Sequence, residues 1–290
     1  MEEALALCRF AQFTAAMGLF GVTLYLRALA SAELRAALAP AARRIAAVAI
    51  PLAAFSALGW WALEAASMTG SWSGPLDIEA LRAVLLETSF GQVWQARLLI
   101  AAALVAMQAL NRYGPSTLML MLSGLLLASL ALVGHATIQA GAIGALHRVN
   151  HALHLLAAGA WLGGLPPFAL CLMAYRDPPL RRDAVEAMRR FSDWGQFDVT
   201  LVIATGVVNV ALTGGVPFPP TTPYRALLTA KLALVAAMIA IALINRYIVA
   251  PNLKPEGKAL RILMGTSLAE VALGSAVIAL VSVFATLDPF

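Results

Sequence analysis

The chain has 290 residues, of which 61% are apolar and 12% are charged, and its mean hydropathy is +0.82. Soluble domains carry roughly 45–50% apolar and about 25% charged residues, so this composition excludes an ordinary water-soluble enzyme and a disordered chain. The net charge of +5 is compatible with nucleic-acid binding, but the basic residues stand in short connectors between apolar runs, as membrane topology requires. Two cysteines, Cys8 and Cys171, are too few for a disulfide framework.

Eight apolar runs are long enough to cross a bilayer, which takes about 20 helical residues. Backbone groups in lipid must bond within their own segment, so each run is predicted to be a helix. Proline and glycine positions such as Pro40 and Gly114-Pro115 are expected to separate the runs. The predicted fold is all-α, a single membrane bundle over residues 1–290 with eight transmembrane helices. The runs cover approximately 4–29, 43–67, 89–111, 115–135, 147–174, 192–214, 224–248 and 260–286.

The segment 76–88, between the second and third runs, is amphipathic. It sets Asp77, Glu79, Arg82 and Glu87 against leucines and Val84. We expect a short helix that lies on the membrane surface next to Trp72.

The Lys and Arg residues predict the orientation of the bundle. Fourteen fall on the side of the connectors near 27–44, 112, 176–190 and 246–261, and six fall on the other. The richer side is predicted to be cytoplasmic, so both termini would face outward.

An internal repeat is suggested by the third and seventh runs. ARLLIAAALVAMQALNRY (96–113) resembles AKLALVAAMIAIALINRY (230–247), with Arg97 and Lys231 at matching positions. Runs four apart cross in the same direction, which suggests two parallel-related four-helix halves, approximately 1–135 and 147–290. Convergence of apolar sequence is the alternative.

All the histidines of the chain fall within twenty residues. His147, His151 and His154 are spaced i, i+4 and i+7 and therefore share one helix face. His135 ends the preceding run, and a short connector makes the two helices antiparallel neighbours. We interpret the cluster as a metal site near the outer surface rather than as interfacial side chains. Imidazole suits copper, zinc, iron and nickel.

Softer or charged groups near the same end are possible further ligands. Cys8 and Met68 would favour Cu(I), and Glu64 is a third candidate, although each is more often a packing residue. His147 and His154 are seven residues apart, which is about 10 Å along a helix, so they cannot easily share one ion. We therefore expect the core of the site to be His151 with one helical neighbour, closed by His135.

Ionisable residues also fall inside the predicted spans. Arg97, Lys231, Asp198 and Glu270 are each costly in lipid and should face the bundle interior. They form either ion pairs between helices or a path for ions or protons. We expect Glu270 to pair with Lys231 or Arg97.

Several segments resemble the copper resistance protein D family, CopD/PcoD. They are GHATIQAG (134–141), HRVNHALHLLAAGAWLGGLPPF (147–168), NRYIVAP (245–251) and ATLDPF (285–290). The resemblance implies an eight-span bacterial inner-membrane protein of copper homeostasis that passes copper into the cytoplasm, often alongside the periplasmic carrier CopC. It places His135, His147, His151 and His154 at the family's histidine positions. We expect the membrane domain alone, without a fused CopC-like domain.

Three functions therefore compete. The first is copper transport or handling from the outer face, without ATP because no nucleotide-binding motif is present. The second is electron transfer by a cytochrome with one haem b, held for example by His135 and His154. The third, a membrane hydrolase, lacks the HExxH motif and any Ser-His-Asp order. We expect no enzyme, no nucleic-acid partner, and the lipid bilayer and copper ions as partners.

Overall fold

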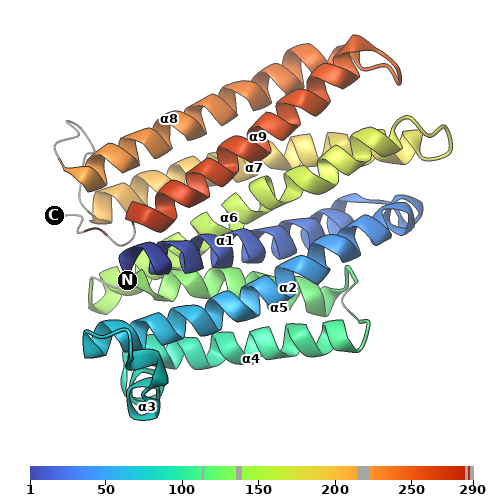
Figure 1. The fold of residues 1–290 in the computed structure, drawn as a ribbon. Helices are drawn as coiled ribbons and strands as arrows, with labels where there is room; N and C mark the ends of the chain where they lie inside the picture. Colours follow the sequence, from blue (N-terminus) through green and yellow to red (C-terminus); the bar gives the residue numbers. More distant parts are fainter. Residues whose placement is uncertain (113, 135–138, 214–221, 285–286, 288–290) are drawn as a thin grey trace.

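The protein is a bundle of long helices (Figure 1). The computed structural model describes residues 1–112, 114–134, 139–213, 222–284 and 287, and these contain no strand. The all-α fold is therefore confirmed. The α-helices are α1 (Glu2–Leu24), α2 (Ala32–Thr69), α3 (Ile78–Glu87), α4 (Ser89–Ala109), α5 (Thr117–Ala128), α6 (Gly141–Ala174), α7 (Arg181–Thr213), α8 (Pro223–Ile244) and α9 (Lys258–Phe284).

Within the described ranges, seven helices are long and apolar enough to cross a membrane. The predicted fourth span is shorter, because α5 ends at Ala128 and continues only as a 3₁₀ turn, η3 (Ser129–Leu132). The prediction that Pro40 separates helices is wrong. Helix α2 begins earlier, where the Ser31 hydroxyl accepts a bond from the Leu34 amide at 3.2 Å, and runs through Pro40.

The two ends of the bundle differ in charge, as predicted. Figure 1 shows the connectors α1–α2, α4–α5, α6–α7 and α8–α9 at one end, and these carry most basic residues. The start of α1, the end of α9 and the short helix α3 lie at the opposite end. Helix α3 buries Ala80 and Val84 against Ala65 of α2, so the predicted amphipathic helix is present. Which end faces the cytoplasm stays a prediction.

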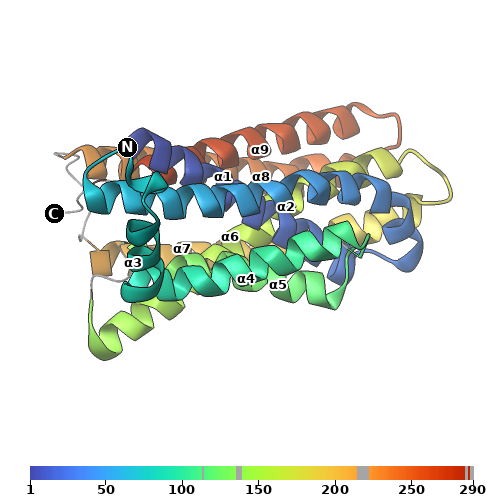
Figure 2. The same ribbon diagram turned by 60° about the horizontal axis from the view of Figure 1, so that its bottom comes forward.

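Helix α1 lies at the centre of the bundle and packs on α2, α5, α6 and α9 (Figure 2). It approaches α6 closely where Gly21 faces Gly163. A Cβ atom added to Gly21 would lie 2.4 Å or less from backbone atoms of Gly163. This close packing of two glycines fixes α6 beside α1.

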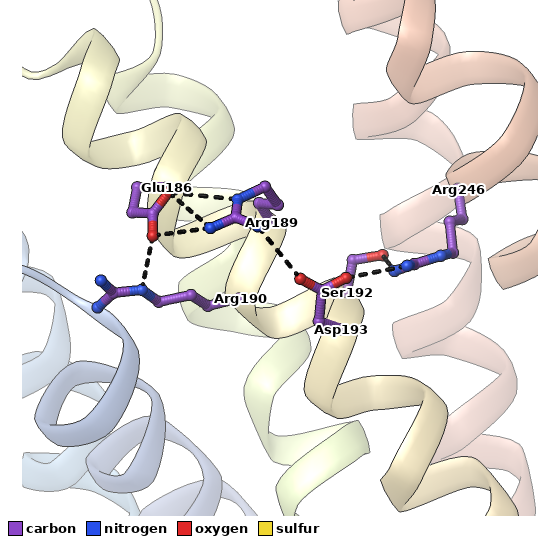
Figure 3. Close-up of polar contacts among 6 residues, drawn as sticks. All are labelled: Glu186, Arg189, Arg190, Ser192, Asp193 and Arg246. Carbon is purple, nitrogen blue, oxygen red and sulfur yellow. Dashed lines mark hydrogen bonds and ion pairs between the residues drawn. The ribbon is translucent and has the colours of Figure 1, made fainter.

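The Asn-Arg-Tyr segment after α8 forms a π-helical turn, η5 (Asn245–Val249), that connects three helices at the basic end. Arg246 binds α7 through Ser192 Oγ at 2.6 Å and Asp193 Oδ1 at 2.9 Å (Figure 3). In the matching segment after α4, the described residues Asn111 and Arg112 are not helical, and Asn111 has a φ of 53°. The two copies differ in structure, and the internal repeat stays a prediction.

Figure 3 also shows an ion-pair cluster on the first turns of α7. Glu186 accepts from Arg189 at 3.1 Å and from Arg190 at 2.9 Å. All three side chains are exposed, so the pairs contribute little to stability.

The buried carboxylate Glu270 has a different partner from the one expected. Asn245 Nδ2 donates to Glu270 Oε2 at 3.2 Å, and Thr266 bonds the Asn245 oxygen at 2.7 Å. No ion pair joins Glu270 to Lys231 or Arg97 among the described residues. Glu270 lies level with Asn245, and Lys231 is fourteen residues before Asn245, about 21 Å away along the helix. Lys231 is therefore out of reach of Glu270.

Arg97 is fully buried and serves packing in this arrangement. Its Nη1 donates to the Leu126 carbonyl at 2.8 Å and to the Ser129 hydroxyl, where α5 gives way to η3. Its guanidinium also lies 4.9 Å from the Trp94 ring centre. Arg97 thus satisfies a carbonyl that the end of α5 leaves without its helical partner.

Candidate functional site

A cavity of about 130 Å³ opens at the end of the bundle where α1 begins. His147, His151 and His154 of α6 all line it, so the predicted common face is confirmed. Helices α1, α2, α7, α8 and α9 supply further walls through residues that include Arg9, Trp60, Asn209, Lys231 and Phe284. The segment 130–134 that follows α5 completes the lining. Helix α6 therefore provides the histidines, while other helices and this segment enclose them.

Two of the imidazoles donate from Nδ1 to fixed acceptors. His147 Nδ1 lies 2.7 Å from Gln139 Oε1, and the Gln139 amide nitrogen is bonded to the Leu212 carbonyl. His154 Nδ1 lies 2.9 Å from the Thr205 hydroxyl, which itself donates to the Leu201 carbonyl. Gln139 Oε1 is an amide oxygen that can only accept, and the Thr205 hydroxyl already donates its proton to Leu201. Nδ1 therefore carries the proton in each neutral ring.

His154 is thereby prepared as a ligand. With the proton on Nδ1, the Nε2 lone pair is available for a metal ion, and no described residue hydrogen-bonds to it. A partner on the second nitrogen is what fixes metal-binding histidines in proteins. Gly206 of α7 lies beside the ring, and a Cβ there would make an ordinary contact with His154 Cε1 at 3.5 Å.

His151 differs from the other two histidines, because its Nδ1 accepts a hydrogen bond. Asn209 Nδ2 donates to His151 Nδ1 at 3.2 Å, and Asn150 Nδ2 holds the Asn209 oxygen at 2.9 Å. This chain of bonds assigns the proton of the neutral His151 ring to Nε2. His151 and His154 stack at 6.2 Å between ring centres, 12° from parallel. His151 and His154 therefore differ in which ring nitrogen carries the proton, a difference that their spacing in the sequence does not show.

Two basic side chains share the cavity with the histidines. Arg9 of α1 is 9% exposed, and its guanidinium lies 5.0 Å from the Trp60 ring centre. Lys231 of α8 places Nζ 5.9 Å from the Phe284 ring centre. None of the described residues that line the cavity is acidic. Its walls are positively charged, which opposes a bare metal cation.

The other predicted ligands lie elsewhere. Cys8 packs toward Gly59 of α2, Met68 is 52% exposed, and Glu64 accepts a bond from the Trp60 indole at 3.0 Å. Asp198 borders a separate, mostly apolar cavity of about 270 Å³. His135 lies outside the described residues. Within those that are described, no three His, Cys, Asp or Glu side chains form a ready metal site.

Sequence reasoning missed most of the partners of the histidines. Gln139 and Thr205 are not related to the histidines by helical spacing in the sequence. Arg9 was considered only as one of the basic residues that predict the orientation in the membrane. One signal was available, because Asn209 and Asn150 are polar residues within apolar helices. Thr205 and Asn209 reach the histidines from α7, a contact that spacing within one helix does not reveal.

Comparison with known proteins gives the family. Residues 1–145 match the family described as "Copper resistance protein D-like, N-terminal domain", and residues 185–284 match "Copper resistance protein D". The chain belongs to the copper resistance protein D family. It is 34% identical to "Inner membrane protein YebZ" of Escherichia coli (strain K12) over 283 residues, 97% of each chain.

Two further relatives carry copper in their names. "Copper resistance protein D" of Pseudomonas syringae pv. tomato is 30% identical, over 87% of this chain and 84% of its own. "Copper transport protein CutJ" of Bacillus subtilis (strain 168) is 31% identical over 50% of this chain and 28% of its own. No solved structure matches the chain. The family is one of copper homeostasis in the inner membrane, as the resemblance implied.

Proposed function

We propose that this protein binds copper at the histidine cavity, from the outer face of the inner membrane, and passes it toward the cytoplasm. A CopC-like periplasmic carrier would deliver the metal. The observation that carries the proposal is the placement of His147, His151 and His154 around one cavity, with Nδ1 of each in a hydrogen bond. Family membership supplies the choice of copper.

The tautomers change the expected order of the ligands. His154 offers Nε2 without rearrangement, whereas His151 would have to exchange its Asn209 bond before either nitrogen could bind copper in the neutral ring. Spacing alone favoured His151. We now expect His154 to contribute most, with ligands beyond this histidine supplied by neighbours in the cluster, His135 among them.

Haem b is the less favoured ligand of the same histidines. Cofactor sites usually measure about 300–1,000 Å³, and this cavity measures about 130 Å³. An absorption spectrum of the purified protein checks this directly, since a Soret band would identify haem and overturn the assignment to copper.

Equilibrium titration of the purified protein with Cu(I) and with Cu(II) tests the site. We expect His154→Ala to weaken copper binding more than His151→Ala, by roughly tenfold or more. Met68→Ala is the matched control, because Met68 is exposed and does not line the cavity. Unchanged affinity in all the histidine variants would refute the site. Copper uptake into proteoliposomes of defined orientation tests the direction of transfer separately.

A further inference from the structure

Two basic residues line the histidine cavity, and the described part of the fold provides no ion-pair partner for either of them. Arg9 of α1 and Lys231 of α8 both line the cavity. Neither forms an ion pair among the described residues. Two unpaired cations at one site in a membrane bundle are costly, so they require a stabilising partner.

Arg9 has an unfilled hydrogen-bonding position. The side chain is about nine-tenths buried, and Nη1 is enclosed without any hydrogen-bond partner. The Glu64 carboxylate attracts Arg9 electrostatically, but it accepts the bond from the Trp60 indole, and Glu64 does not line the cavity. A buried guanidinium nitrogen without an acceptor is destabilising, and an anion in the cavity would supply one.

The size of the cavity limits that anion. A volume of about 130 Å³ exceeds the roughly 10–15 Å³ that one water needs, and it is well below that of most cofactor sites. The polar residues Thr213, Tyr224 and Asn209 also line it. The cavity therefore has space beside Arg9 and Lys231 for an anion of a few heavy atoms together with its waters.

We propose that this cavity is an anion site, which takes a small monoanion of the halide or carboxylate class between Arg9 and Lys231. The anion offsets the positive wall beside His147, His151 and His154. It binds without copper, so the site stands independently of the proposed function. When copper is present, the same anion lowers the electrostatic penalty on a cation at the histidines.

Chloride and acetate are the probes, each exchanged for gluconate at constant ionic strength in the purified full-length protein. Binding is measured by chloride NMR line broadening and, for both anions, by the rise in the thermal unfolding midpoint. We expect saturable binding by at least one of them, and the stronger arm identifies the class. Arg9→Gln and Lys231→Gln should each weaken it roughly tenfold or more, as loss of a hydrogen bond to a charged group predicts.

Arg82→Gln is the matched control, because Arg82 is an exposed basic residue of α3 outside the cavity. It should leave anion binding unchanged. Arg9 also packs on Trp60, so the Lys231 variant guards against an effect of misfolding. Absence of saturable binding by either anion, or wild-type affinity in both Arg9→Gln and Lys231→Gln, would overturn the proposal.

Discussion

Replacing Gly163 by alanine tests how α6 is seated against α1. A Cβ at Gly163 would lie 3.0 Å from Gly21 Cα and closer still to the Met17 carbonyl oxygen. Both are backbone atoms, so no side chain can rotate away. The helices would have to separate, and such overpacking typically costs about 1–3 kcal/mol.

Gly18→Ala is the matched control on α1. A Cβ at Gly18 meets no atom within 4 Å. Both substitutions gain helix propensity, by up to about 1 kcal/mol, so that gain cancels in the comparison. The two variants should therefore differ in free energy of unfolding by about the overpacking cost, with Gly163→Ala the less stable.

Thermal unfolding of both variants in the same detergent measures this difference. One kcal/mol shifts the midpoint by about 2–4 °C in chains of 150–250 residues, so a gap of several degrees is expected. Helix α1 carries Arg9 and α6 carries the histidines, so separation should also weaken copper and anion binding. Equal midpoints for Gly163→Ala and Gly18→Ala would refute the close-packing argument.

Three other outcomes follow from contacts in the bundle. Glu270→Gln should keep the bond from Asn245 and retain the unfolding midpoint, whereas Glu270→Leu should cost about 1–3 kcal/mol; equal midpoints would count against this network. Thr205→Val removes the acceptor that fixes His154 and should lower copper affinity about 10–100-fold in titrations, with Thr200→Val on the exposed face of α7 unchanged. A periplasm-dependent reporter fused after Phe290 should be active, and activity of a cytoplasm-only reporter there would reverse the orientation.

The sequence by itself determined the class of protein and the helix face that carries the three described histidines. Long apolar runs leave helices as the only stable form in lipid, and composition alone shows them. The spacing of His147, His151 and His154 gives a common face because the helical repeat is a local property. The amphipathic helix α3 was predicted for the same local reason.

Only the tertiary structure decided what surrounds those elements. Neighbouring helices set which residues meet, so Glu270 bonds Asn245 rather than a basic residue, and Cys8 packs on α2 away from the histidines. The cations Arg9 and Lys231 are more than two hundred residues apart, and no local pattern connects them to one cavity. The proton positions on His151 and His154 depend on α7, because its side chains supply the donor for one ring and the acceptor for the other.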